Sequence, residues 1–538
     1  MMNKNRFGPI PFILLVGVLF FGCIYFFSKD SNPKQNIITK HEKQENLYGP
    51  HYSLWKDEAK SKSLNPESID KVIKLNDKTN HYENHLKGYN LNYPSTWEID
   101  HHQATHYTRL FSKNLRVDIT VQNVEDISLS TQAYIYHTLN TIKPYITVDK
   151  TFNVSNFQVR NVDYKRPALK GIHNDLNHYS YYFVTQGKYV YTFQLKTNEK
   201  LHKAAKQKMV TLLDSFKTAQ PTSIELNTKV KNKNSNPEVN LNHNNKSLVI
   251  PKNHFLMGIY TPTSLDINEI DAFTGNHVGS QMFYKPINSE YDAYVEQLVQ
   301  ENRLPVVTFL LERANSEHNE DVVTSMIEGE FDKTMESWIS GIKQTQSPVF
   351  IRIGNEMNGN WSDWSHKNNF NDPDLYKLAY RHIVSIFKEN QVDNAYFIWN
   401  PNNVSAPLFE WNHATMYYPG DTYVDFIGMT SYNFGPSAGN HYKSFDEMYE
   451  ELYWDYSRSY ASKPLMIGEF GAVEAGDNKS KWILDMFNHI PTKYPNIKAA
   501  IWFDETHGKF DLRIHSSMES ANAFKQGMNK PEVITSLK

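Results

Sequence analysis

The segment Val349–Trp361, VFIRIGNEMNGNW, carries the pattern on which the fold assignment depends. Its first five residues are β-branched or aromatic apart from Arg352, as expected for a strand buried on both faces. The following residues, GNEMNG, are polar and favour a turn, and they include Glu356. Barrel enzymes place catalytic groups at the carboxyl ends of such strands. Taken alone, however, Glu356 fits an ordinary loop glutamate better than a catalytic one.

The rest of the C-terminal half repeats this strand-like pattern. Further apolar runs are found at His254–Tyr260, His277–Tyr284, Pro305–Leu311, Ala395–Asn400, Val424–Ser431, Pro464–Gly468 and Lys498–Phe503. Amphipathic stretches between them predict helices. Eight strands with intervening helices predict an α/β fold, a (β/α)8 TIM barrel over residues 248–538. An open doubly wound sheet is the alternative, but no glycine-rich dinucleotide motif follows any of these strands.

The predicted strand ends bring a second carboxylate into the same site. The seventh strand ends in Gly468-Glu469-Phe470-Gly471. In an eight-stranded barrel the fourth and seventh strands lie on roughly opposite sides of the mouth, so Glu356 and Glu469 face each other. Tryptophan, tyrosine and asparagine end the neighbouring strands. Two facing carboxylates with aromatic walls predict the hydrolysis of glycosidic bonds in a polysaccharide.

A series of ordered motifs resembles glycoside hydrolase family 26, the β-mannanase-like family of a retaining barrel clan, over residues 250–538. The motifs are Gly329-Glu330-Phe331-Asp332, Arg352 with Glu356-Met357-Asn358-Gly359 and Trp361, Tyr380-Arg381-His382, Trp399-Asn400-Pro401-Asn402, Tyr418-Pro419-Gly420-Asp421, Tyr432-Asn433, Gly468-Glu469-Phe470-Gly471 and Trp502-Phe503. The resemblance says nothing about the first 245 residues.

The resemblance implies roles for four residues of the site. Glu356 is expected to be the proton donor, the general acid/base, and Glu469 the nucleophile that forms a glycosyl-enzyme intermediate. Arg352 is expected to keep Glu469 ionised through its fixed positive charge. Tyr432 is expected to donate a hydrogen bond to Glu469 and to orient it.

The resemblance also implies sugar-binding tryptophans. Trp502 is expected to form the floor under the sugar being cleaved, and Trp361 and Trp364 are candidates for stacking on the leaving-group sugars. Packing within the barrel is the alternative for each of the three.

One residue departs from the pattern of mannan-cutting relatives. These enzymes usually carry histidine immediately before the acid/base, where this chain has Asn355. Thr430-Ser431, before Tyr432, also replaces the usual Asp-Gly. The expected activity is therefore an endo-acting β-glycosidase with β-1,4-mannan as the family default substrate. The alternatives are a β-glucanase, an exopolysaccharide-processing hydrolase, and an inactive carbohydrate-binding protein that takes part in polysaccharide assembly.

The N-terminus predicts attachment to a membrane. Phe7–Phe27 contains 21 residues without a charge, enough to span a bilayer as a helix, and Lys4 and Arg6 precede it. We expect a single-pass cell-membrane anchor with the C-terminal domains outside the cell. A lipoprotein signal at Cys23 and a cleaved secretion signal are the alternatives, and both also place the bulk of the chain outside the cytoplasm.

Composition divides the region between the anchor and the barrel. Residues 28–84 are polar and predict a flexible tether, and residues 220–247, rich in Asn and Lys, predict a linker. Between them, 85–219 predict an α+β accessory domain that weakly resembles the PsbP/Mog1-like fold through Tyr93-Pro94-Ser95-Thr96-Trp97.

Other classes of function find little support in the sequence. The net charge of -3 and the lack of a basic patch do not favour nucleic-acid binding. The only cysteine lies in the anchor, and the histidines lack HxH or HExxH spacing, so we expect no metal and no cofactor. No feature identifies a protein partner.

Overall fold

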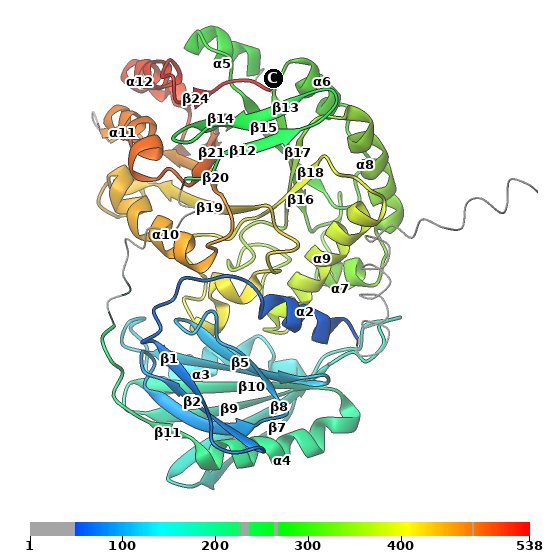
Figure 1. Cartoon of the computed structure of the whole chain (residues 1–538). Coiled ribbons are helices and arrows are strands. Elements are labelled where there is room, and N and C mark those ends of the chain that lie inside the picture. The colour runs from blue at the N-terminus through cyan, green and yellow to red at the C-terminus, as the bar shows by residue number, and fades with distance from the viewer. Residues whose placement is uncertain (1–48, 225, 227–235, 263–266, 476–477) are drawn as a thin grey trace, which may run out of the picture.

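The computed structural model describes residues 49–224, 226, 236–262, 267–475 and 478–538. It consists of a C-terminal barrel and an N-terminal α+β domain, which lies below the barrel in Figure 1 with helix α2 between them. No helix in these ranges is both long and apolar enough to cross a membrane. The predicted anchor, residues 7–27, falls outside the described residues.

Eight parallel strands form the closed barrel that the sequence predicts. Each strand pairs with the next, and β14 closes the ring by pairing with both β15 and β21. The strands are β14 (Phe255–Tyr260), β15 (Ser280–Pro286), β16 (Leu304–Leu310), β17 (Val349–Ile353), β18 (Ala395–Trp399), β19 (Phe426–Asn433), β20 (Leu465–Ala472) and β21 (Ile497–Phe503). The fold is therefore a (β/α)8 TIM barrel.

Helices surround this barrel on the outside (Figure 1). They are α5 (Ile267–Thr274), α6 (Tyr294–Gln300), α7 (Val322–Ile327), α8 (Asp332–Thr345), α9 (Pro373–Glu389), α10 (Phe445–Ser459), α11 (Asn478–Lys493) and α12 (Met518–Met528). The connection between β18 and β19 forms only two short 3₁₀ turns, η2 (Glu410–Asn412) and η3 (Ala414–Tyr417).

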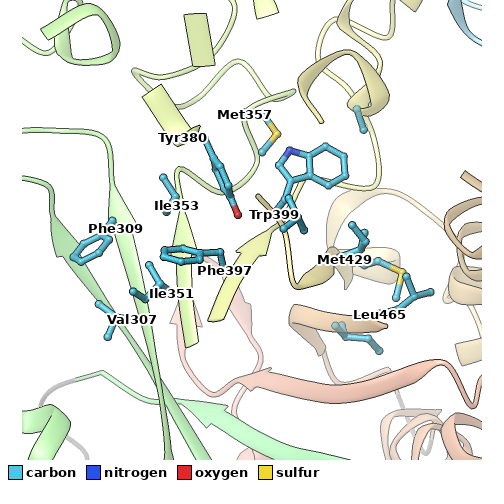
Figure 2. Packing of buried hydrophobic residues seen from close by; sticks show 14 of the residues in the cluster. Val307, Phe309, Ile351, Ile353, Met357, Tyr380, Phe397, Trp399, Met429 and Leu465 are labelled. Carbon is cyan, nitrogen blue, oxygen red and sulfur yellow. The ribbon is translucent and has the colours of Figure 1, made fainter. Parts of the chain in front are cut away.

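Alternation along the strands separates the inside of the barrel from its outside. Inward side chains such as Val306, Phe350 and Ile398 form one buried cluster. Outward side chains pack under the helices in a second cluster, in which Figure 2 shows Phe397 of β18 beside Tyr380 of α9. Because both faces are buried, most strand residues are apolar, as the sequence pattern predicts.

The predicted linker, 220–247, is partly folded. Strands β12 (Val239–Asn242) and β13 (Ser247–Ile250) form a hairpin. Val239 and Leu248 join the inward-facing cluster of the barrel strands. The boundary prediction was therefore too late, because a short hairpin with only a few apolar residues has little signal in an Asn/Lys-rich sequence.

The α+β domain contains two antiparallel sheets and two helices. The larger sheet has the order β4-β5-β6-β10-β9-β8-β7 and the smaller β1-β2-β3-β11. The elements are β1 (Asp70–Lys74), β2 (Thr79–Asn84), β3 (Tyr89–Pro94), β4 (Glu98–Asp100), β5 (Tyr107–Ser112), β6 (Leu115–Asn123), α3 (Thr131–Asn140), β7 (Ile146–Val154), β8 (Phe157–Lys165), β9 (His178–Gln186), β10 (Tyr189–Thr197), α4 (Glu199–Ser215) and β11 (Lys217–Thr218).

The second half of the predicted tether, 28–84, is also folded. Helix α2 (Pro50–Glu58) buries Leu54 and Trp55, and β1 and β2 complete the smaller sheet. The tether prediction was wrong here because the segment is polar on average. Leu54, Trp55 and Tyr82 are buried against distant parts of the chain, which composition does not reveal.

Helix α2 and the residues after it pack on the outside of the barrel. The helix contacts α9. Leu64 N donates to Arg458 O at the end of α10, and Ala461 N donates to Lys62 O. The segment thus lies between α9 and α10, where a helix linking β18 to β19 would stand in a regular barrel. The two domains are therefore packed together rather than merely linked.

Candidate active site

Glu356 stands in a tight turn directly after β17. Its backbone is left-handed, with φ of 57°, and Gly354 two residues earlier has φ of 50°. A glutamate rarely adopts this conformation, which costs of order 1 kcal/mol and is concentrated at functional sites. The turn is tied to the next strand because Glu356 N donates to Asn400 O at 2.8 Å.

Glu469 lies inside β20, where the pairing is irregular. The register with β19 shifts between Met429 and Thr430, and Glu469 pairs with Thr430. Beside it, Gly468 packs so closely on Asn400 that an added Cβ would lie 1.7 Å from the amide oxygen. A side chain at Gly468, the first residue of the GEFG motif, would therefore clash with Asn400. The absence of a side chain there allows Glu469 to project into the barrel mouth.

Four side chains donate hydrogen bonds to the Glu469 carboxyl. Tyr284 Oη and Asn355 Nδ2 donate to Oε1 at 2.6 and 3.3 Å, and Arg352 Nη2 donates to the same oxygen. Tyr432 Oη donates to Oε2 at 2.5 Å. Glu469 is thus an acceptor on both oxygens and is paired with a fully buried guanidinium, an arrangement suited to a fixed carboxylate.

Glu356 has different surroundings. Asn402 Nδ2 donates to its Oε1 at 2.9 Å and Trp361 Nε1 to its Oε2 at 2.8 Å. No cation pairs with it among the described residues. Burial raises the pKa of the Glu356 carboxyl to about 7, and the negative charge of Glu469 adds to this rise, although the two hydrogen bonds oppose it. The site therefore separates its two acids, with Glu356 able to hold a proton near neutral pH.

Both carboxyls line one cavity of about 500 Å³. Trp361, with 56% of its surface exposed, lies on the Glu356 side. The remaining lining residues are Tyr284, Asn355, Asn402, Tyr432, Phe434, Phe503, His507, Phe510 and Leu512. Aromatic walls around two acids suit a ligand with apolar faces and many hydroxyls. Within the described residues no three potential metal ligands from His, Cys, Asp and Glu are grouped.

The structure does not place Trp502 or Trp364 in this cavity. Trp502 is fully buried on the outside of the barrel against Phe470, and its Nε1 donates to Leu512 O. The predicted sugar floor was therefore wrong for this residue, because strand alternation turns Trp502 outward and its neighbour Phe503 inward. Trp364 is also buried, and its Nε1 donates to Asn355 O at 2.7 Å.

Two polar contacts of the acids were missing from the predicted set. Tyr284 at the end of β15 contacts Glu469, and Asn402 after β18 contacts Glu356. Both lie at carboxyl ends of strands, so position in the barrel could have indicated them. Phe434 directly follows β19, and His507 and Phe510 pair in the short hairpin of β22 (Thr506–His507) and β23 (Phe510–Asp511) after β21, where the sequence gives no comparable signal.

Comparison with known proteins agrees with this geometry. Residues 287–503 match the model of glycosyl hydrolase family 26. This part of the chain therefore resembles the proteins of glycosyl hydrolase family 26. The match contains β16 to β21, and hence both Glu356 and Glu469.

Curated relatives match a little over a third of the chain. Endoglucanase H of Acetivibrio thermocellus is 33% identical over 206 residues, which is 37% of this chain and 22% of the relative. A mannan endo-1,4-beta-mannosidase of Bacillus subtilis is 28% identical over 202 residues, 36% of this chain and 50% of the relative. The chain thus spans at most half the length of these two relatives.

Solved structures of this family are also similar to the chain. A GH26 beta-mannanase from Bacteroides ovatus aligns with a TM-score of 0.39 and 16% identity, covering 52% of this chain and 90% of that one.

Removal of the Tyr284 hydroxyl tests the role of its hydrogen bond to Glu469. We expect Tyr284→Phe to lower kcat by about 10- to 100-fold, because a hydrogen bond to a charged group contributes about 1.5–3 kcal/mol. Steady-state kinetics on a polysaccharide that the wild-type protein hydrolyses would measure the effect. Tyr376→Phe is the control, since Tyr376 is also a tyrosine whose hydroxyl donates a hydrogen bond within the barrel domain, but it is fully buried and donates to Ile353 O outside the cavity. An unchanged kcat in Tyr284→Phe would show that the contact is not used.

The protonation of Glu356 predicts the pH dependence. If Glu356 is the proton donor that the sequence predicts, it must be protonated to act, so kcat/KM should fall as the pH rises through about 7. Trp361→Phe removes a hydrogen bond that favours the charged carboxylate, so this variant should move the alkaline limb to higher pH. A pH–rate profile for both proteins checks this. An alkaline limb that stays in place in Trp361→Phe would contradict the assignment of the limb to Glu356.

Proposed function

We propose that the chain is a retaining, endo-acting β-glycosidase that cleaves a polysaccharide. The observation that carries the proposal is the pair of carboxyls in one cavity with opposite surroundings. Glu469 is paired with Arg352 and two tyrosines, whereas Glu356 is half-buried, forms no ion pair among the described residues, and has a pKa raised to about 7. A proton donor and a nucleophilic carboxylate require these two environments.

The proposed reaction follows from these positions. Glu356 gives its proton to the glycosidic oxygen while a Glu469 oxygen attacks the anomeric carbon, and the leaving sugar departs as an alcohol. A glycosyl ester on Glu469 remains. Glu356, now ionised, takes a proton from water, and the water oxygen attacks the anomeric carbon and releases the carboxylate. Two displacements at the same carbon retain its configuration.

The substrate proposal follows the relatives and Asn355. β-1,4-Mannan is the first candidate because the Bacillus subtilis relative is named a mannan endo-1,4-beta-mannosidase. β-Glucan is the second, since the Acetivibrio thermocellus relative is named an endoglucanase. Asn355 borders the cavity, and its buried Oδ1 has no hydrogen-bond partner among the described residues. This oxygen can accept a hydrogen bond from a sugar hydroxyl.

The proposal also retains the location expected from the sequence. An anchor at residues 7–27 would hold the barrel at the outer face of the cell membrane, where a polysaccharide substrate is accessible. Support for this location comes from the sequence pattern of the N-terminus alone.

The release of reducing ends from a panel of polysaccharides tests the proposal. The panel contains β-1,4-mannan, glucomannan, mixed-linkage β-glucan and β-1,3-xylan. We expect wild type and the exposed-site control Glu336→Gln to release oligosaccharides from at least one polymer, and Glu356→Gln to release about 10³-fold less. Binding of a polymer without release by wild type would instead support the inactive carbohydrate-binding protein.

A further inference from the structure

The α+β domain meets the barrel through buried charges at the start of α9. Lys196 Nζ lies 2.6 Å from Asp372 Oδ2 and 3.0 Å from Asp374 Oδ2. Arg116 also pairs with Asp374, and Trp55 Nε1 donates to the same carboxyl at 2.9 Å. All of these side chains are buried. Such an interface fixes geometry, because each charge needs its partner in place.

The loop before α9 is held by the same domain. Phe370 and Asn371 have left-handed backbones, with φ of 55° and 52°. Tyr164 Oη donates to Phe370 O at 3.1 Å, and Asn371 Nδ2 donates to Thr138 O at 2.8 Å. Two residues in an unfavourable conformation are therefore stabilised by contacts from α3 and β8.

This loop leads directly back to the turn of Glu356. Asn369 Nδ2 donates to Trp364 O at 2.8 Å. Trp364 Nε1 in turn donates to Asn355 O, the carbonyl that precedes the Glu356 peptide nitrogen. The loop before α9, called the first loop below, thus connects the α+β domain to the backbone at Glu356.

The loop after β18, called the second loop below, forms a second connection between the α+β domain and Glu356. Trp411 Nε1 donates to Thr138 Oγ1 at 3.1 Å, and Glu410 N donates to Gln122 Oε1 at 2.9 Å. Lys87 forms an ion pair with Glu410 at 2.8 Å. Each partner on the domain side comes from a different element, so the short η2 turn is held from several directions.

Asparagines carry this second connection to the Glu356 side chain. Asn412 Nδ2 donates to Asn358 O at 2.9 Å. Asn358 donates to Asn402 O and accepts from Asn402 N, both at 2.9 Å. Asn402 Nδ2 finally donates to Glu356 Oε1. The chain of contacts is continuous from the α+β domain to the carboxyl.

We propose that the α+β domain is a brace that positions Glu356, with Thr138 as the residue that holds both loops. The Thr138 carbonyl accepts from the first loop and its hydroxyl from the second. The inference rests on the proposed function for the role of Glu356 as proton donor. Thr138, Asn358 and Asn412 are positioning residues, since they act through Asn402 and through the backbone of Asn355.

The brace predicts a change in the proton affinity of Glu356 that a loss of packing alone would not cause. Loss of the Thr138 hydroxyl leaves the buried Trp411 Nε1 without an acceptor, and the loop it belongs to shifts. Asn402 then loses its bond to the Glu356 carboxylate. Because this bond favours the charged form, the affinity of Glu356 for its proton should rise.

Fluorine NMR of Trp361 tests the brace without relying on activity. The ten tryptophans are labelled as 5-fluorotryptophan in the full chain, and the resonance absent from Trp361→Phe is that of Trp361. Trp361 Nε1 donates to Glu356, so its shift should titrate in wild type and not in Glu356→Gln. We expect Thr138→Val to raise the midpoint by about 0.5 pH unit or more.

Thr108→Val is the matched control. Thr108 is also buried in the α+β domain, where its hydroxyl accepts a hydrogen bond from Tyr89 and forms another with the Tyr82 hydroxyl, but its contacts stay within that domain. Its midpoint should equal that of wild type. An unchanged midpoint in Thr138→Val, an equal shift in both variants, or no titration of Trp361 in wild type would each overturn the brace.

Kinetics provides a second readout. We expect kcat to fall about tenfold in Thr138→Val with KM changed less than about twofold, because the proton donor rather than the sugar contacts is displaced. If Thr138→Val does not fold, Gln122→Leu removes the acceptor of Glu410 N and should shift the Trp361 midpoint in the same direction. A chain without hydrolytic activity would refute the proposed function, whereas the fluorine titration would still decide on the brace.

Discussion

Replacement of Glu469 by alanine is expected to reduce kcat by about 10⁴-fold or more, because no other group can attack the anomeric carbon. The loss should be measured with an activated aryl β-glycoside, whose leaving group needs little help from Glu356. With this substrate the defect reports the nucleophile alone.

Added azide distinguishes the roles of the two acids. In Glu469→Ala, azide can occupy the space of the missing carboxylate and should restore turnover with an α-glycosyl azide as product. In Glu356→Ala, the glycosyl ester on Glu469 still forms, so azide should give a β-glycosyl azide. The opposite pair of products would contradict the assignment of acid and nucleophile.

Glu469→Ala should also lower stability, and this effect must be separated from the chemistry. The variant leaves Arg352 buried without its carboxylate, which costs about 3–5 kcal/mol for a buried pair. Glu469→Gln keeps the volume and can accept from Arg352 through its amide oxygen. It should be more stable than Glu469→Ala and equally inactive without azide.

Lys196→Met is expected to cause the largest loss of stability among single changes at the domain interface. It leaves Asp372 and Asp374 close together with one cation fewer, and breaking a buried pair in this way costs about 3–5 kcal/mol. Because the two domains share this cluster, calorimetry should show one transition that moves to lower temperature. Two transitions, with only one of them shifted, would show that the domains unfold independently.

Lys188→Met is the control for the charge change. Lys188 is partly exposed and pairs with Glu125 at 2.9 Å on the surface of the same domain. Exposed pairs contribute little to stability because water and salt screen them, so the Lys188→Met transition should stay close to that of wild type. Equal losses in the two lysine variants would mean that the cluster at α9 adds no special stability.

Much of the barrel could be predicted from the sequence because its strands are buried on both faces. Segments such as Val349–Ile353 and Lys498–Phe503 consist mostly of apolar residues. Their regular spacing along the chain predicts their order in the barrel. The direction of individual side chains is harder to predict. Trp502 and Phe503 are both apolar, and only the alternation fixed by pairing places Phe503 in the cavity and Trp502 beneath α11 and α12.

The two acids were predictable because each stands near the carboxyl end of a strand within a specific motif. Tyr284 was not singled out, although it also stands near a strand end, because tyrosine is common in this chain, which has 33. The domain interface had no sequence signal at all. Lys196 and Asp372 are 176 residues apart, and neither a charge pattern nor a periodicity connects them.

The configuration of the first product tests the central claim most directly. A ¹H NMR spectrum taken within the first minutes of polysaccharide hydrolysis shows which anomer is released before mutarotation mixes the two forms. Double displacement at Glu469 predicts that the β-anomer appears first and the α-anomer grows in later. Initial release of the α-anomer would contradict Glu469 as the nucleophile of a retaining enzyme.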